Sequence, residues 1–139
     1  MPTQRRFGYS GTPLARKLGI KESSRVLLLG APDDFADLLE PLRAGVKFEG
    51  NAGPCVDIAH VFVTHKEELA RHLGVLRKML RPDAALWVSW PKKASKVLTT
   101  VTEDTIRELA LPIGFVDVKV CAVSDIWSGL KLVVRKELR

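Results

Sequence analysis

The chain has 139 residues, of which 46% are hydrophobic and 27% charged, and this balance is that of one ordinary globular domain with a hydrophobic core. Its apolar runs are too short to span a membrane, and its polar, Gly-rich start is unlike a secretion signal, so we expect a cytoplasmic protein. The net charge of +6 indicates a nucleic-acid partner only weakly, since an ordinary solvated surface explains it better.

The chain starts with a segment that we expect to lie outside the central sheet. Residues 1–139 are predicted to form a single domain, in which residues 1–24 are an N-terminal extension that carries a short helix. Thr12 is placed to cap this helix, Pro13 suits its first position, and Gly19 ends it.

Two predicted strands and a helix follow the extension. Residues 25–29 are a continuous apolar run that ends at Gly30, a pattern typical of a buried strand in a parallel sheet. A helix with one apolar face is predicted between Pro32 and Pro41. Residues 45–49 are expected to form the second strand.

The clearest predicted helix comes after a third strand at residues 57–63. Thr64 and Glu67 have the spacing of a capping box, in which two side chains satisfy backbone N–H groups of the first turn. Leucines at helical spacing follow, and Pro82 ends the segment. We therefore predict a helix whose first turn is capped by the Thr64 hydroxyl.

The last third of the chain has the pattern of a strand, a helix and a hairpin. Residues 84–90 form an apolar strand, and Thr102 is placed to cap the next helix. Residues 115–123 and 130–135 are the two final strands, and the short link between them predicts an antiparallel pair.

This order of elements defines the expected fold class. Alternating strands and helices indicate an α/β, three-layer, Rossmann-like fold, with helices on both faces of a mainly parallel sheet. With its C-terminal antiparallel hairpin, the predicted sheet resembles the methyltransferase variant of the doubly wound fold.

Long blocks of sequence carry a more specific resemblance. The blocks are residues 8–14 with 17–21, 86–96 with 101–104, and 116–123 with 127–133. Through them the chain is similar to an uncharacterised bacterial family, the domain of unknown function numbered 3052. This resemblance covers nearly the whole chain and implies no particular activity.

A looser resemblance, by element order, is to S-adenosylmethionine-dependent methyltransferases, and it implies a cofactor site after the first strand. The Gly-x-Gly-x-Gly pattern expected there reads Gly30-Ala-Pro-Asp-Asp34, with a single glycine. Pro32 removes a backbone donor, and Asp33 places negative charge where a dinucleotide pyrophosphate would bind, which disfavours NAD and FAD. We predict no cofactor. S-adenosylmethionine, which has no phosphate, is the alternative and is expected to bind weakly or not at all.

A basic cluster after the fourth predicted strand is the candidate ligand site. It consists of Lys92, Lys93, Ser95 and Lys96, at the strand end where ligands bind in open α/β sheets. Ammonium groups and a hydroxyl suit a phosphate or carboxylate, so a small anionic ligand is one expected partner and a protein is the other. The alternative is that acidic residues at predicted helix starts neutralise the cluster. These residues are Asp33, Asp34, Glu103 and Asp104.

Further residues are predicted to line a pocket at the same edge of the sheet. Glu49 ends a strand where an acidic side chain binds ribose hydroxyls in this fold, with a plain surface position as the alternative. His65 is a candidate general base, with an exposed helix-start residue as the alternative. Trp87 and Trp90 should point to opposite faces of their strand. The pocket-rim candidates are Gly30, Ala31, Asp33, Glu49, His65, Trp90 and Trp127.

Three functional hypotheses follow. The single glycine favours a non-catalytic ligand-binding or protein-interaction domain on a methyltransferase-like scaffold, so we lean toward a protein that is not an enzyme. A degenerate S-adenosylmethionine-dependent methyltransferase is the alternative, and a basic nucleic-acid-binding module is the third. No metal site is expected, because Asp57 and His60 face opposite sides of their strand.

Overall fold

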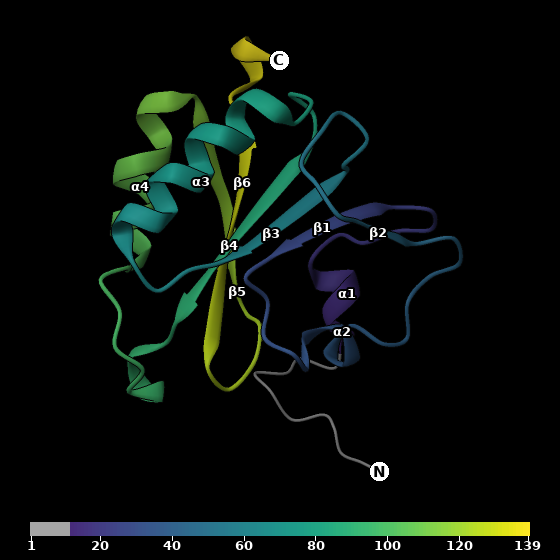
Figure 1. Ribbon diagram of the computed structural model, residues 1–139, viewed down its shortest axis with the longest axis horizontal. Helices are drawn as coiled ribbons and strands as arrows, with labels where there is room; N and C mark the ends of the chain where they lie inside the picture. The colour runs from purple at the N-terminus through teal and green to yellow at the C-terminus, as the bar shows by residue number, and fades with distance from the viewer. Residues whose placement is uncertain (1–11) are drawn as a thin grey trace.

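Six strands form one mixed sheet in the computed structural model, which describes residues 12–139 (Figure 1). The strand order is β2-β1-β3-β4-β6-β5. The parallel strands are β1 (Arg25–Leu29), β2 (Lys47–Glu49), β3 (Ile58–Phe62) and β4 (Ala85–Pro91). The last two strands, β5 (Phe115–Ala122) and β6 (Trp127–Val134), form the predicted antiparallel hairpin, and β6 pairs with β4. The start of the N-terminal extension, through residue 11, lies outside the described residues.

Helices cover both faces of the sheet, so the predicted three-layer α/β fold is confirmed (Figure 1). One face packs against α3 (Lys66–Met79) and α4 (Glu103–Ala110). The other packs against two single-turn helices, α1 (Leu14–Lys17) and α2 (Phe35–Leu38). Three short 3-10 segments complete the chain: η1 (Lys93–Ser95), η2 (Leu111–Ile113) and η3 (Lys136–Leu138).

The central strand β3 shows why the sequence forms three layers. All five of its residues are buried, since successive side chains point to opposite faces and both faces are covered. Ala59 and Val61 join the core beneath α3 and α4, whereas Ile58 and Phe62 join the core beneath α1 and α2. A continuous apolar run, rather than an alternating one, is therefore the correct pattern for this position in the sheet.

The start of α3 differs from the prediction. The helix begins at Lys66, and the side chain of its N-cap residue, His65, makes no capping hydrogen bond; instead Lys66 N donates to Thr100 Oγ1 at 2.8 Å. The Thr64 carbonyl accepts hydrogen bonds from Thr99 Oγ1 at 2.8 Å and from Thr100 N at 3.0 Å. Because these long-range bonds fix Thr64 in the connection that leaves β3, the predicted capping box between Thr64 and Glu67 does not form, and that prediction is wrong.

The two short helices also differ from what the sequence predicts. The N-cap position of α1 is Pro13 rather than Thr12, and no side chain caps this helix. The helix expected between Pro32 and Pro41 is reduced to the single turn of α2. A proline cannot donate a backbone hydrogen bond and disfavours a helical residue before it, so two prolines this close leave little room for a helix.

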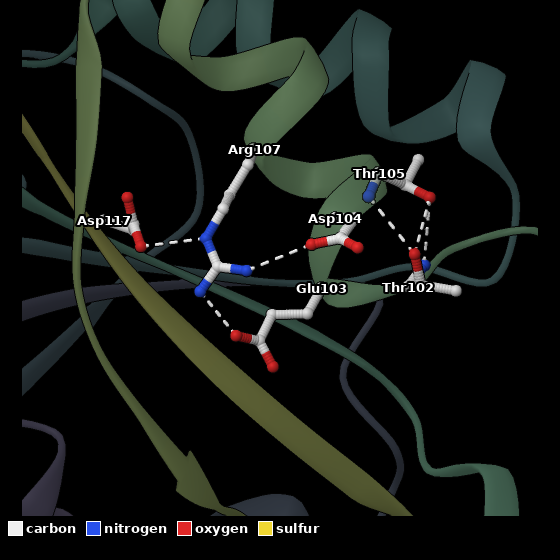
Figure 2. Close-up of polar contacts among 6 residues, drawn as sticks. All are labelled: Thr102, Glu103, Asp104, Thr105, Arg107 and Asp117. Carbon is white, nitrogen blue, oxygen red and sulfur yellow. Dashed lines mark hydrogen bonds and ion pairs between the residues drawn. The ribbon is translucent and has the colours of Figure 1, made fainter.

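The N-terminus of α4 confirms the cap predicted at Thr102, and Figure 2 shows its contacts. The Thr102 hydroxyl accepts a hydrogen bond from Thr105 N at 3.2 Å, and the Thr105 hydroxyl accepts one from Thr102 N at 3.2 Å. Further along the helix, Arg107 Nε binds Asp117 Oδ2 on β5 at 2.9 Å. The other guanidinium nitrogens bind Glu103 and Asp104, so both acidic side chains of this first turn are already paired.

The two threonines at the predicted helix starts provide a matched pair of variants. Thr102→Ala should lower the free energy of unfolding by about 1 kcal/mol, because it leaves a backbone N–H of α4 without its cap. Thr64→Ala should change it by less than about 0.5 kcal/mol, because the contacts of Thr64 are made by its backbone. Urea unfolding of both variants measures the difference. Equal losses would mean that the Thr102 cap contributes nothing specific.

Candidate functional site

The order of the strands creates a topological switch point between β1 and β3. Strand β1 pairs with β2 on one side and with β3 on the other. The chain therefore leaves β1 in one direction to form β2, and then passes back across β1 to form β3 on the other side. In open α/β sheets, ligands bind outside the carboxyl ends of the strands at such a switch point. We define the candidate site as the carboxyl ends of β1, β3 and β4 with the loops that follow them.

Gly30 forms the turn that leaves β1 at this switch point. Its φ of +71° lies in the left-handed region, and a Cβ built there would lie 2.8 Å from the carbonyl oxygen of Phe62. Only glycine fits without displacing the end of β3. Gly30 thus has the role of the first glycine in the dinucleotide fingerprint, which is to allow a tight turn after the first strand.

Acidic side chains follow this turn. Asp33 and Asp34 are exposed, and neither side chain forms an ion pair within residues 12–139. The other two acids expected to neutralise the lysine cluster, Glu103 and Asp104, are bound to Arg107. The predicted internal neutralisation is therefore wrong, and the loop after β1 presents negative charge that suits a cation.

The lysine cluster follows β4 at the same edge. Lys92 N donates to the carbonyl of Ile126 at 2.7 Å, which ties the start of the loop to the β5–β6 connection. The Ser95 hydroxyl donates to the Lys92 carbonyl at 2.6 Å and accepts from Val97 N at 3.2 Å, so local backbone groups occupy it. In the described part of the chain, Lys92, Lys93 and Lys96 form no ion pair. The three lysines, without Ser95, stay candidates for binding an anion.

Two other predicted rim residues lie in different settings: Glu49 is in register with Leu27 in the middle of β1, whereas His65 follows the carboxyl end of β3. Glu49 ends β2, and its Oε2 binds Arg25 Nη1 at 3.0 Å. A ribose would therefore share this carboxylate with Arg25. His65 is exposed at the N-cap position of α3, next to the carboxyl end of β3. His65 therefore remains a candidate base, whereas the Glu49 carboxylate is already bound to Arg25.

The tryptophans are more buried than a pocket rim requires. Trp87 and Trp90 point to opposite faces of β4, as predicted, and both are buried, with 0% and 8% of their surface exposed. Trp90 packs in the core beneath α3 and α4, so its assignment to the pocket rim is wrong. Trp127 is half-buried and lies edge-on against the ring of Phe62, with ring centroids 5.2 Å apart.

His60, which the sequence analysis weighed only as a metal ligand, is a buried histidine beneath the site. His60 is fully buried on β3, where its Nε2 lies 2.6 Å from Ser89 Oγ. Its ring stacks on Phe62 at 4.4 Å and meets Phe35 edge-on at 5.1 Å. Burial lowers the pKa of His60 to about 3, so the ring is neutral near pH 7. The available signal was one ionisable residue in an otherwise apolar strand.

The site's surroundings contain few other ligand-binding features. Within residues 12–139, no three His, Cys, Asp or Glu side chains gather as a metal ion would require. Cys55 and Cys121 are free thiols. None of the helices in this part of the chain has the length and apolar character needed to cross a membrane.

Solved structures share this fold, although no family model and no curated protein sequence matches the chain. The resemblance to the family numbered 3052 therefore stays a prediction. A S-adenosylmethionine-dependent methyltransferase from Aquifex aeolicus is 16% identical, with a TM-score of 0.63, 87% of this chain covered and 87% of that chain covered. Fibrillarin from Aeropyrum pernix, solved with natively bound S-adenosylmethionine, is 18% identical, with a TM-score of 0.54 and coverages of 86% and 73%. The fibrillarin pre-rRNA processing protein of Methanococcus jannaschii is 15% identical, with a TM-score of 0.52 and coverages of 87% and 73%.

These matches correct the leading functional hypothesis. Similarity at this level of identity shows the fold, which is the Rossmann-like fold of methyltransferases. The neighbours favour the methyltransferase alternative over a non-catalytic domain, so the latter prediction is wrong. The prediction that the chain has no cofactor is likewise not supported, because these neighbours include proteins that use or bind S-adenosylmethionine. The chain has a methyltransferase fold with a switch point, one essential glycine and an acidic loop at its carboxyl edge.

Proposed function

We propose that this chain binds S-adenosylmethionine across the carboxyl ends of β1 and β3 and transfers its methyl group to an acceptor. The turn at Gly30 carries the proposal, because it places an acidic loop directly at the topological switch point. The structural neighbours support it, since one of them, the fibrillarin of Aeropyrum pernix, was solved with this cofactor natively bound.

The charges at the switch point fit S-adenosylmethionine better than a phosphate-bearing cofactor. Asp33 and Asp34 would attract the sulfonium and ammonium groups, whereas they would repel a pyrophosphate. Pro32 and Asp34 stand where the usual pattern has its second and third glycines, so the backbone lies less open to the cofactor. We therefore expect binding with a dissociation constant of roughly 0.1 mM, weaker than a complete glycine pattern would give.

The residues around the site have distinct proposed roles. S-adenosylmethionine supplies an electrophilic methyl group on its sulfonium when it is bound. Asp33 and Asp34 hold the positive end of the cofactor, and Lys92 with Lys93 binds an anionic group in the loop after β4. His65, exposed beside the carboxyl end of β3, is placed to accept a proton from the acceptor.

Calorimetric titration with S-adenosylmethionine tests the proposal. The Asp33→Asn, Asp34→Asn double variant should bind at least about fivefold more weakly than the wild type, because two carboxylates facing a cation are lost. S-adenosylhomocysteine has an uncharged thioether in place of the sulfonium. The ratio by which the protein binds S-adenosylmethionine more tightly than S-adenosylhomocysteine should therefore be smaller in the same variant. Asp37→Asn is the matched control, since Asp37 is also exposed but lies within α2.

Two outcomes would overturn the proposed function. One is the absence of binding by the wild type at cofactor concentrations up to about 5 mM, well above the expected dissociation constant. The other is an equal loss of affinity in the double variant and in Asp37→Asn, which would reduce the effect to the net charge of the protein.

A further inference from the structure

A surface cavity of about 320 Å³ lies at the opposite, amino-terminal edge of the sheet. Its walls come from the segments that precede β1, β3 and β4, together with the end of α1 and the middle of β6. Because β4 is seven residues long, the cavity lies roughly 20 Å from the carboxyl ends of the strands. The charged residues that line it are Lys21, Asp57, Arg81, Asp83 and Lys131.

Both acidic residues in the wall of this cavity are paired with Arg81, which leaves the three side chains with one net negative charge. Arg81 binds Asp57 Oδ1 through Nη2 at 2.9 Å and Asp83 Oδ1 through Nε at 2.9 Å. The second carboxylate oxygen of Asp57 accepts a hydrogen bond from Arg25 N at 2.8 Å. Burial acts to raise the pKa of Asp57, but the hydrogen bonds from Arg25 and Arg81 outweigh it and the pKa is lowered. Both acids are therefore engaged by Arg81, and within residues 12–139 neither forms an ion pair with a lysine of the cavity.

The opposite wall carries positive charge without a counterion. Lys21 and Lys131 line the cavity, and Lys119 stands directly opposite Lys131 on the neighbouring strand. Between residues 12 and 139, none of these three lysines forms an ion pair, and residues 1–11 contain no Asp or Glu. Like charges directly opposite each other destabilise a sheet. An anion bound beside Lys131 would offset part of this repulsion.

The surroundings of Lys131 hold its ammonium group in the cavity wall. Lys131 is half-buried, and a Cβ on Gly19 would lie 4.0 Å from its Nζ, which places the ammonium at the end of α1. The Leu18 carbonyl at this helix end already accepts a hydrogen bond from Trp87 Nε1 at 2.9 Å. Burial, followed by the charges of Lys119 and Lys21, lowers the pKa of Lys131. The group is thus partly dehydrated, next to like charges, and open to a ligand on one side.

We propose that this cavity, the lysine cavity, binds the phosphate group of a small molecule between Lys21 and Lys131. Its volume is at the small end of the range for ligand sites, which fits a compact phosphate-bearing molecule. Lysine ammonium groups bind phosphate as point charges and need no precise bidentate geometry. Ser24, which also lines the cavity, accepts a hydrogen bond from Lys21 N at 2.9 Å, so its own hydroxyl hydrogen remains to donate.

The melting temperature of the full chain in phosphate tests this assignment. Inorganic phosphate at about 10 mM should raise it by about 3 °C over chloride at the same ionic strength, because a ligand that binds only the folded state stabilises it. Lys131→Met should melt higher than the wild type without ligand, since the repulsion is relieved, and should lose the phosphate-dependent rise. Lys66→Met is the matched control, since Lys66 is an exposed lysine at the start of α3, at the carboxyl edge of the sheet. Ribose 5-phosphate extends the test: tighter binding than phosphate indicates a phosphorylated molecule as the occupant, and equal binding indicates free phosphate.

Several results would overturn the proposal that the lysine cavity binds phosphate. An equal rise in chloride would reduce the effect to charge screening. A rise that persists in Lys131→Met but disappears in a Lys92→Met, Lys93→Met double variant would place the anion at the carboxyl edge instead. Titration of Lys131→Met with S-adenosylmethionine should match that of the wild type, so failure of this proposal is distinguishable from failure of the proposed function.

Discussion

Replacing Gly30 with alanine should lower the free energy of unfolding by about 3 kcal/mol, one of the largest effects expected from a single methyl group in this protein. The left-handed φ of +71° is strained for alanine, and the added Cβ would lie 2.8 Å from the Phe62 carbonyl oxygen, which belongs to the backbone of β3 and has little room to move. Urea unfolding of the variant measures the loss.

Gly50→Ala is the matched control for this measurement. No atom lies within 4 Å of a Cβ built at Gly50, and its φ is not in the left-handed region, so the change should be within about 0.5 kcal/mol. If Gly30→Ala cost less than about 1 kcal/mol, the turn after β1 would not be pressed against β3 as the structure describes. The geometry of the switch point would then be wrong.

The second large effect concerns acid stability and comes from His60. Burial lowers the pKa of His60 from 6.5 to about 3 in the folded protein. Between these two values the unfolded chain binds a proton that the folded protein does not, so stability is fully present above pH 6.5 and is lost as the pH falls. The complete loss would be about 5 kcal/mol, of which about 3 kcal/mol is expected by pH 4.5.

Variants separate His60 from other titrating groups. His60→Gln should lose most of the pH dependence between pH 6.5 and 4.5. His72→Gln should keep most of it, since His72 is only half-buried, and the lowering of its pKa by burial is opposed by the charge of Glu68. The pKa values of Asp57 and Asp117 are also lowered, but carboxylates with lowered pKa values lose their stabilisation only below about pH 4.

Ser89→Ala provides a second test that does not depend on whether the His60 variant folds. It removes the hydroxyl 2.6 Å from His60 Nε2 and should lower stability by about 1–2 kcal/mol at every pH, while the slope with pH stays that of the wild type. Unfolding free energies measured from pH 7 to 4.5 report both quantities. A flat profile for the wild-type protein would show that His60 is not held neutral by burial.

The sheet could be predicted from the sequence because its signals are local. Continuous apolar runs marked β1, β3 and β4, and the short link between the last two strands marked the hairpin. The α3 cap could not be predicted, because the Thr64 carbonyl is bound by Thr99 and Thr100, which are distant in sequence. Competition from tertiary contacts, rather than a wrong helical period, moved the start of that helix.

The candidate site was predictable only in part. Gly30 was identified because a strand followed by a single glycine has a local signature, and the structure gives it a positive φ. Trp90 was assigned to a rim because the strand pattern does not show how completely the helices bury both faces of β4. The lysine cavity had no sequence signal at all, since Lys21 and Lys131 come together only when α1 packs beside β6.

Amide chemical shifts of the isotopically labelled full chain during titration with S-adenosylmethionine test the central claim most directly. Binding at the switch point should shift the amides of Gly30, Ala31 and Thr64, which stand at the carboxyl ends of β1 and β3. The amides of Lys21 and Lys131, at the other end of the sheet, should stay in place. Shifts confined to Lys21 and Lys131, or no shift at saturating cofactor, would contradict a methyltransferase site at the carboxyl edge.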